Sequence, residues 1–282
     1  MNNEFYIHGQ VALVTGGNVG IGRVTAIELA KRGFKVVIAG RSLERTQPVL
    51  DHIKSLKVDE SAIFLPLDLA SLASVRKCAQ LFLQLNLPLH LLINNAGVAG
   101  HRGLTQDGFE MTFGVNHLGH FLLTQLLLNK LQTSGLSRVI TVSSRAHKRA
   151  TAIDWDALQL HTRSITGVRE YSVSKLANLL FSAELAKRVQ GTSISTYALH
   201  PGVVDTEIWR AVPSWARPLL RLRGFLTPEE GALTTLHCAM HAPKQESGLY
   251  YADSKSMQPA SLGNNSELAI ELWRRSEEWV KI

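Results

Sequence analysis

The chain of 282 residues carries a formal net charge of +7, and 45% of its residues are hydrophobic. This length suffices for one large α/β domain with a full core, and no apolar run approaches the roughly 18 residues of a membrane span. The positive charge includes no long run of Lys or Arg, which argues against a nucleic-acid partner. Two isolated cysteines, Cys78 and Cys238, predict buried thiols in a reducing compartment and no disulfide framework.

Strand-like and helix-like runs alternate along the chain. Apolar runs predict strands at residues 11–14, 36–39, 63–69, 89–93, 138–142, 194–199 and 249–251. Helical periodicity and capping signals predict helices at residues 20–32, after Ser71, at 107–132, at 171–189, from a capping box at Thr227, and at 267–280. Near-continuous apolar strands that alternate with helices are typical of a parallel sheet covered on both faces.

These elements predict a single α/β domain over residues 1–282, a doubly wound Rossmann-type fold with a mostly parallel sheet and helices on both faces. Ligands of such folds bind in the crevice at the carboxyl ends of the strands. Residues 145–169 and 203–226 have little regular pattern, and both leave that edge. We expect an active-site loop at 145–169 and a substrate lid at 203–226, because long loops in compact domains are usually functional.

A glycine-rich turn with Gly16, Gly20 and Gly22 joins the first predicted strand to the first predicted helix. The spacing is a variant of the Rossmann fingerprint, in which glycines let backbone N–H groups approach a pyrophosphate at a helix N-terminus. A glycine-rich turn alone is often only structural, but its place between a strand and a helix favours a dinucleotide site.

The second predicted strand is followed by Gly40, Arg41 and Ser42, with no acid before Glu44. NAD-specific sites place an Asp or Glu here to bind the ribose 2′-hydroxyl. A carboxylate would repel a 2′-phosphate, whereas the Arg41 guanidinium can bind one through two hydrogen bonds. The alternative is a solvated arginine in a loop.

Tyr171 and Lys175 stand four residues apart, about one helical turn, so both side chains project from the same face of a predicted helix. A phenol with a pKa of about 10 is a poor acid or base at neutral pH, and a nearby ammonium favours the phenolate and lowers that pKa. The pair therefore predicts proton transfer beside the dinucleotide. Such a spacing also arises by chance, so it needs a supporting context.

That context is present in order along the chain. Asn94-Asn95-Ala96-Gly97 follows a predicted strand, Asn116 lies in a predicted helix, and Ser143-Ser144 and Pro201-Gly202 each follow a further strand. With the glycine turn and the Tyr–Lys pair, these residues resemble the short-chain dehydrogenase/reductase family over nearly the whole chain. The resemblance is greatest to its retinol-dehydrogenase-like branch, at residues 154–156, 174–178, 200–204 and 249–253.

The resemblance implies four catalytic residues, Asn116, Ser144, Tyr171 and Lys175. In that arrangement Ser144, rather than Ser143, polarises the substrate carbonyl, and Tyr171 transfers the proton. Lys175 lowers the pKa of the phenol and binds the nicotinamide ribose. Asn116 holds a water that relays protons to Lys175.

The resemblance also implies NADP(H) as the cofactor, with Arg41 on the 2′-phosphate, Asp68 on the adenine, and Val204 and Thr206 on the carboxamide. The residues implied in cofactor binding are Gly16, Asn18, Gly20, Ile21, Gly22, Arg41, Asp68, Leu69, Asn95, Ala96, Gly97, Tyr171, Lys175, Pro201, Gly202, Val204 and Thr206.

We therefore expect an oxidoreductase that transfers a hydride between NADP(H) and an apolar aldehyde or ketone, or the matching alcohol. A retinoid or a fatty aldehyde is the substrate by analogy with the branch. Two alternatives stay open: an epimerase or dehydratase of the extended family, whose glycine spacing differs, and a non-catalytic NADP(H)-sensing or scaffold protein. The eleven histidines are scattered, so we expect no metal site.

The sequence also suggests partners and a location. Family members often pair through the helices near Asn116 and Tyr171, which implies a homodimer or homotetramer. Residues 1–4 have neither the basic nor the apolar region of a secretory signal, so we expect a cytoplasmic protein. Arginines are interleaved with Trp215 and several leucines at 210–223, so a peripheral membrane contact is the alternative to a lid there.

Overall fold

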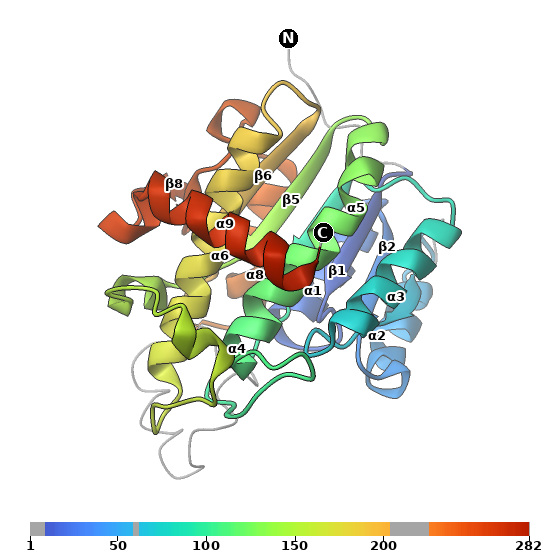
Figure 1. Cartoon of the computed structure of the whole chain (residues 1–282). Coiled ribbons are helices and arrows are strands. Elements are labelled where there is room, and N and C mark those ends of the chain that lie inside the picture. The colour runs from blue at the N-terminus through green and yellow to red at the C-terminus, as the bar shows by residue number, and fades with distance from the viewer. Residues whose placement is uncertain (1–8, 59–61, 204–225, 282) are drawn as a thin grey trace.

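Eight strands pair side by side in the order β3-β2-β1-β4-β5-β6-β7-β8 within the computed structural model, which describes residues 9–58, 62–203 and 226–281 (Figure 1). Every neighbouring pair is parallel except β7 and β8, which are antiparallel. The strands are β1 (Val11–Thr15), β2 (Lys35–Gly40), β3 (Ile63–Pro66), β4 (Leu91–Asn94), β5 (Ser137–Val142), β6 (Ile194–His200), β7 (Tyr250–Ala252) and β8 (Lys255–Met257). The sheet confirms the predicted doubly wound, mostly parallel fold.

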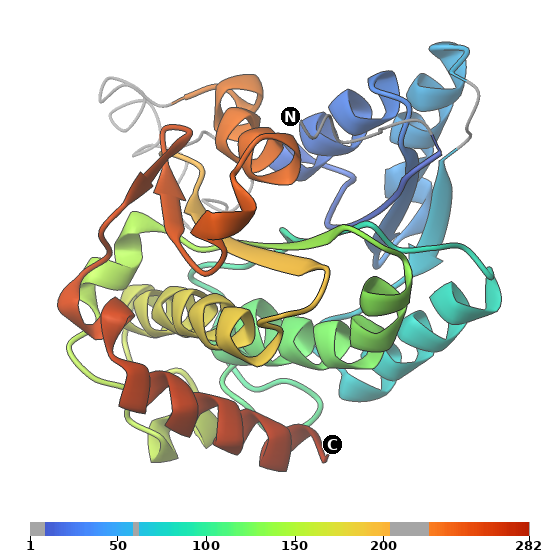
Figure 2. The same cartoon turned by 90° about the horizontal axis from the view of Figure 1, so that it is seen from above.

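Both faces of the sheet are apolar, because successive side chains of a strand point to opposite sides. In β1, Val11 and Leu13 join one core, whereas Ala12 and Val14 join the other. Figure 2 shows the helices in two layers, one on each side of the sheet. One layer contains α1 (Gly20–Lys31), α2 (Leu43–Ser55) and α8 (Pro228–Met240), and the other contains α3 (Leu72–Gln84), α5 (Gly119–Thr133) and α6 (Val168–Arg188).

A further helix, α9 (Ser266–Val280), packs against the outer side of α6. Its Trp273 ring lies 5.0 Å from Phe121 of α5 and 5.8 Å from Phe181 of α6, measured between ring centroids. The Arg188 guanidinium lies 4.3 Å from the centroid of Trp273. Any pairing of two chains through α5 and α6, as the sequence suggested, therefore has to accommodate α9.

Local capping signals located two helices correctly. The Ser71 hydroxyl accepts a hydrogen bond from Ser74 N at 3.3 Å at the start of α3, and Thr227 and Glu230 form the predicted capping box of α8. The strand predicted at 63–69 is too long, because β3 ends at Pro66 and the Asp68 carboxylate turns the chain by accepting from Ala70 N. Helix α2 and strand β8 were not predicted.

The helix predicted at 107–132 begins later and is interrupted. It starts with the short helix α4 (Met111–Phe113), passes through a π-helical turn, η1 (Gly114–Leu118), and continues as α5. Asp107 lies outside it and accepts a hydrogen bond from Leu72 N at 2.8 Å, so it serves α3 instead. Single π-helical turns of this kind occur frequently at functional sites, and this one contains Asn116.

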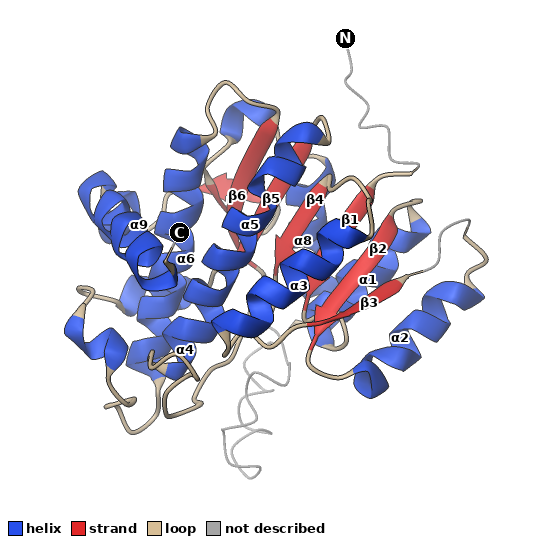
Figure 3. Ribbon diagram, turned by 45° about the vertical axis from the view of Figure 1, so that its right-hand side comes forward, coloured by secondary structure: helices blue, strands red, loops and turns tan. Residues whose placement is uncertain are grey.

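The order of the strands reverses between β1 and β4, which are neighbours in the sheet (Figure 3). In doubly wound folds, ligands bind in the crevice at the carboxyl ends of the strands at such a point. The predicted active-site loop contains two short 3-10 turns, η2 (Arg145–Arg149) and η3 (Asp156–Gln159). Of the predicted lid, Val203 and Leu226 are joined by a hydrogen bond of 2.9 Å from Leu226 N to Val203 O. Its other residues, including Val204, Thr206 and 210–223, lie outside the described part of the chain.

Candidate active site

The glycine turn between β1 and α1 has a backbone conformation that would be strained in residues other than glycine. Gly16 and Gly20 have φ angles of +66° and +55°, in the left-handed region that favours glycine. A Cβ atom on Gly22 would lie 2.3 Å from Gly16 O. The first turn of α1 has neither a side-chain cap nor an acid. Its N–H groups therefore fit an anion such as a dinucleotide pyrophosphate.

Thr15 joins this turn to the one that follows β4. Its hydroxyl oxygen accepts hydrogen bonds from Asn95 N and Ala96 N, both at 3.0 Å. In return, the Asn95 amide donates to Thr15 O at 2.8 Å. The predicted cofactor residues Asn95, Ala96 and Gly97 are thus fixed beside the glycine turn. Asn18 and Ile21, which are partly buried, belong to the same turn and to the start of α1.

The predicted specificity residues follow β2 and β3. Arg41 is exposed at the end of β2 and forms no ion pair with a described residue, so its guanidinium is free for a phosphate. Asp68 is partly buried, and one of its carboxylate oxygens accepts from Ala70 N at 3.0 Å. The Leu69 side chain is buried in the core against α5, so only its backbone is available to a cofactor.

Tyr171 and Lys175 lie on the first turns of α6, as predicted. Lys175 is only 2% exposed, its ammonium nitrogen donates to Val142 O at 2.8 Å, and the same nitrogen lies 5.7 Å from the centre of the Tyr171 ring. Burial lowers the pKa of Lys175 to about 7, because desolvation penalises the charged form.

The expected lowering of the pKa of Tyr171 is wrong for this geometry. Burial raises the pKa of the phenol, and the nearby Ser144 hydroxyl only partly opposes that rise. The physical reason is the desolvation of the buried phenol, which penalises the phenolate. The phenol therefore keeps its proton at neutral pH.

The two serines after β5 have different partners. The Ser143 hydroxyl is buried and donates to Lys175 O at 2.6 Å, so it fixes α6 to the sheet. The Ser144 hydroxyl is partly buried, accepts from Ala146 N at 3.1 Å and lies near the Tyr171 phenol. Ser144 is therefore the serine placed beside the tyrosine, as the sequence suggested.

Asn116 lies in the π-helical turn η1 with its side chain fully buried. Its amide nitrogen donates to Val98 O and to Ser174 Oγ, both at 3.0 Å, and its amide oxygen accepts from Val98 N at 2.8 Å. Both N–H groups are thus used to connect the loop after Gly97 to α6. The geometry places Asn116 where it holds other parts of the site in position.

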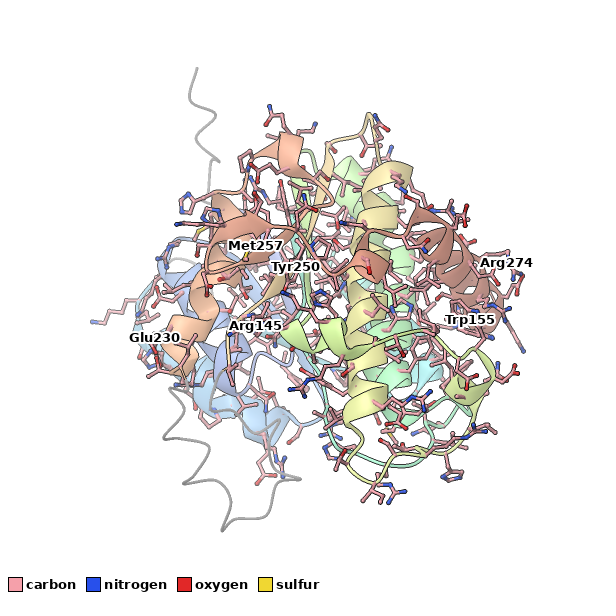
Figure 4. All side chains as sticks on the ribbon, turned by 90° about the vertical axis from the view of Figure 1, so that its left-hand side faces the viewer. Arg145, Trp155, Glu230, Tyr250, Met257 and Arg274 are labelled. Carbon is pink, nitrogen blue, oxygen red and sulfur yellow. The ribbon has the colours of Figure 1, made fainter. Side chains whose placement is uncertain are left out.

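The segment after β6 is tied to the loop after β5. Gly202 has a φ of +89°, and a Cβ atom there would lie 2.2 Å from Leu226 Cδ1, so this turn requires glycine. His200, just before Pro201, accepts a hydrogen bond from Arg145 Nε at 2.8 Å. Figure 4 shows Arg145 in the same region as Tyr250 of β7. No local pattern predicts this bond, because the two residues are 55 positions apart.

A separate pocket of about 190 Å³ lies between the active-site loop and the first turns of α6, lined by residues that include Glu110, Leu158, Arg163, Glu170 and Val173. None of the four predicted catalytic residues lines it. At 100° per residue, the helical positions of Glu170 and Val173 place it on the side of α6 away from the catalytic pair. The pocket is therefore distinct from the crevice.

In the described ranges no group of three His, Cys, Asp or Glu side chains is close enough together to hold a metal ion. Within the same ranges, no helix combines the length and the apolar character needed to cross a membrane. Both cysteines are free and buried, and burial raises the pKa of the Cys78 thiol to about 12.

Comparison with known proteins identifies the family. A family model described as short chain dehydrogenase matches residues 10–155. The chain is 44% identical to retinol dehydrogenase 12 of Mus musculus over 281 residues, covering 98% of this chain and 88% of that protein. It is 45% identical to polyprenol dehydrogenase of Mus musculus over 278 residues, covering 94% and 82% of the two chains.

Solved structures agree with these sequence relatives. A short chain dehydrogenase from Burkholderia cenocepacia in complex with NADP superposes with a TM-score of 0.71 at 25% identity, covering 92% of this chain and 99% of that one. The chain therefore belongs to the short-chain dehydrogenase/reductase family and is similar to its retinol dehydrogenases.

Proposed function

We propose that this short-chain dehydrogenase/reductase transfers a hydride between NADP(H) and an apolar aldehyde or ketone, or the matching alcohol. The observation that carries the proposal is the convergence of Ser144, Tyr171 and Lys175 at the same sheet edge as the uncapped glycine turn. A dinucleotide site and a proton donor in one crevice are the two requirements of this chemistry.

The proposal that NADP(H) is the cofactor rests on the backbone of the glycine turn and on the positive charge of Arg41. NADP(H) would be held by the N–H groups at the start of α1, with Arg41 on the 2′-phosphate. The nicotinamide, when bound, supplies or accepts the hydride. The solved Burkholderia relative, which contains NADP, supports the choice of a phosphorylated cofactor.

The chain's own residues supply the polarisation and the proton. In the reducing direction, Ser144 donates a hydrogen bond to the carbonyl oxygen and Tyr171 delivers its proton as the hydride arrives. The raised pKa of the phenol suits this direction, because a protonated tyrosine is the required donor. Lys175, buried beneath the tyrosine ring, contributes to the nicotinamide ribose site.

An apolar substrate is supported by the names of two relatives, retinol dehydrogenase and polyprenol dehydrogenase, since both alcohols are long isoprenoids. The predicted lid is also rich in Trp and Leu. The same segment supports a peripheral membrane contact through 210–223, because its arginines are interleaved with apolar side chains. A cytoplasmic location and a homodimer or homotetramer are further proposals that come from the sequence alone.

The test is oxidation of NADPH, followed by absorbance, over aldehydes and ketones of graded chain length that include retinaldehyde. We expect turnover that increases with chain length and falls when NADH replaces NADPH. Tight NADPH binding without turnover of any carbonyl would favour a sensing or scaffold protein. Substrate conversion without net change in NADPH would favour an epimerase or dehydratase.

A further inference from the structure

His120 stands at the centre of a buried hydrogen-bond chain that the proposed mechanism has not used. It lies on the first turn of α5 and is 1% exposed. Its Nδ1 atom lies 3.0 Å from Asn116 O, and its Nε2 atom lies 2.9 Å from Thr15 Oγ1. The ring therefore spans the distance from the π-helical turn to the residue that precedes Gly16.

The direction of each hydrogen bond follows from the partners. A carbonyl oxygen only accepts, so Nδ1 must carry the proton that points to Asn116 O. In the neutral ring Nε2 is then an acceptor, and the Thr15 hydroxyl donates to it at 2.9 Å, with Ile93 O at 3.3 Å as the more distant acceptor for the same proton. The Thr15 oxygen keeps its lone pairs for Asn95 N and Ala96 N. Burial lowers the pKa of His120 to about 4, which keeps the ring neutral and this arrangement fixed at physiological pH.

Each end of this chain belongs to a different part of the site. Thr15 fixes the turn of Asn95 and Ala96 beside the glycine turn. Asn116 fixes Val98 and also Ser174, which lies on α6 between Tyr171 and Lys175. A displacement of the imidazole would break the bond to Asn116 O and leave the Thr15 hydroxyl with Ile93 O, at 3.3 Å, as its remaining acceptor, and lost buried hydrogen bonds are costly.

We propose that His120 is a positioning residue that couples the cofactor turn to the proton-donating face of α6, so that cofactor affinity and turnover depend on one imidazole. The expected effect on turnover rests on the proposed function. The link between His120 and the cofactor turn does not, because NADPH binding alone measures it.

The principal variant is His120→Phe, which keeps an aromatic ring and removes both hydrogen bonds. We expect its Kd for NADPH to rise and its kcat to fall, each by about tenfold. The matched control is His117→Phe, three residues earlier. His117 is also 1% exposed, but its Nε2 bonds to Ser276 of α9 at 3.0 Å, on the side away from the crevice. We expect His117→Phe to lower the Tm while Kd and kcat stay near those of the wild type.

Two further variants separate the two bonds. His120→Asn retains a donor near the position of Nδ1, so we expect it to recover most of kcat while NADPH affinity stays weak. Thr15→Val removes the bond to His120 and also the acceptor of Asn95 N and Ala96 N, so we expect it to weaken NADPH binding at least as much as His120→Phe, with little additional loss in the double variant.

The proposal is overturned if His120→Phe keeps wild-type Kd and kcat, or if His117→Phe changes both as much. Additive losses in the double variant would also overturn it. A wild-type protein that reduces no carbonyl refutes the proposed function instead, and the NADPH affinities of His120→Phe, His117→Phe and Thr15→Val still decide whether His120 supports the cofactor turn.

Discussion

The two halves of the crevice are built by different means. The cofactor half consists of the short turns after β1, β2, β3 and β4, and its backbone is fixed by the sheet and by contacts such as Thr15 with Asn95. The substrate half that we propose is the long loop at 145–169, to which the sequence adds the predicted lid at 203–226. In the described loop, positions are fixed by side chains from elsewhere in the chain, since Glu110 accepts from Thr162 Oγ1 at 2.6 Å and Glu170 accepts from Ser164 N at 2.9 Å.

Because of this difference, we expect the type of reaction and the choice of substrate to depend on different parts of the molecule. The class of reaction depends on a few backbone conformations at strand ends, which glycine and the sheet impose. The substrate depends on the loops, whose shape depends on many weaker side-chain contacts. Variants in one half should therefore change cofactor use or chemistry, and variants in the other should change substrate use.

The largest expected effect is that of Tyr171→Phe, which removes the proton donor where the halves meet. Loss of a general acid costs about 100- to 10,000-fold in rate, and we expect kcat to fall within that range. NADPH affinity should change little, because it comes mainly from the glycine turn and Arg41. Steady-state kinetics and NADPH fluorescence titration measure the two quantities, and a kcat within a few-fold of the wild type would rule out the mechanism.

Acid should destabilise both halves through buried histidines. Burial lowers the pKa to about 4 for His120, which bonds to Thr15 beside the cofactor half, and to about 3 for His200, which bonds to Arg145 of the substrate half. The unfolded chain therefore binds more protons than the folded one below pH 6.5. As the pH falls below 6.5, the free energy of unfolding should therefore decrease by about 1.4 kcal/mol per pH unit for each such histidine.

Urea unfolding between pH 5 and pH 8 measures this slope. His117 is buried in the same way, with a pKa of about 3, and should add to it. Replacing His200 by Gln should reduce the slope by about one proton, that is, by about 1.4 kcal/mol per pH unit. Stability that does not change between pH 5 and pH 6.5 would mean that these imidazoles are hydrated or already charged in the folded chain.

Cofactor preference should depend on Arg41 in the cofactor half. Arg41→Asp removes a charge-assisted contact worth about 1.5–3 kcal/mol and adds repulsion against the 2′-phosphate. We expect the ratio of kcat/KM for NADPH to that for NADH to fall by at least tenfold. Lys54→Gln, an exposed position near the other end of α2, is the control. An unchanged ratio in Arg41→Asp would mean that Arg41 is only solvated.

The smallest effect should come from the substrate half. Glu170 accepts hydrogen bonds from Arg163 N at 3.2 Å and Ser164 N at 2.9 Å, and it also bonds to the Ser164 hydroxyl. Glu170→Ala frees this loop, and we expect KM for a long-chain aldehyde to rise by about three- to tenfold with no change in NADPH affinity. Glu271→Ala, which removes ion pairs on the surface of α9, is the matched control. A change in NADPH affinity in Glu170→Ala would contradict the separation of the halves.

The parts of the fold that could be predicted from sequence are those with local causes. Strand β1, the Ser71 cap and the Thr227 capping box each depend on residues a few positions apart. Helix α2 was missed because Pro48 and many polar residues conceal its pattern. The start of the helix at Met111 was misplaced because Asp107 caps α3, a contact between segments 35 residues apart.

In the candidate site, too, the features with local causes are those that could be predicted from sequence. Tyr171, Lys175 and Ser144 could be located by spacing, and the structure brings them together. The raised pKa of Tyr171 could not be predicted, because it depends on the burial of the phenol in the folded chain. His120 carried a usable signal, since it stands four residues after Asn116 on a helix, but its bond to Thr15 spans 105 residues.

The most direct test of hydride transfer in this crevice uses NADPH that carries deuterium at C4 of the nicotinamide, with a long-chain aldehyde as substrate. Mass spectrometry of the product alcohol then reports where the hydride came from. We predict an alcohol one mass unit heavier, from one of the two C4-labelled diastereomers only, formed by the wild type and nearly absent with Tyr171→Phe. An unlabelled alcohol from both diastereomers, or equal labelled product from Tyr171→Phe, would contradict the account.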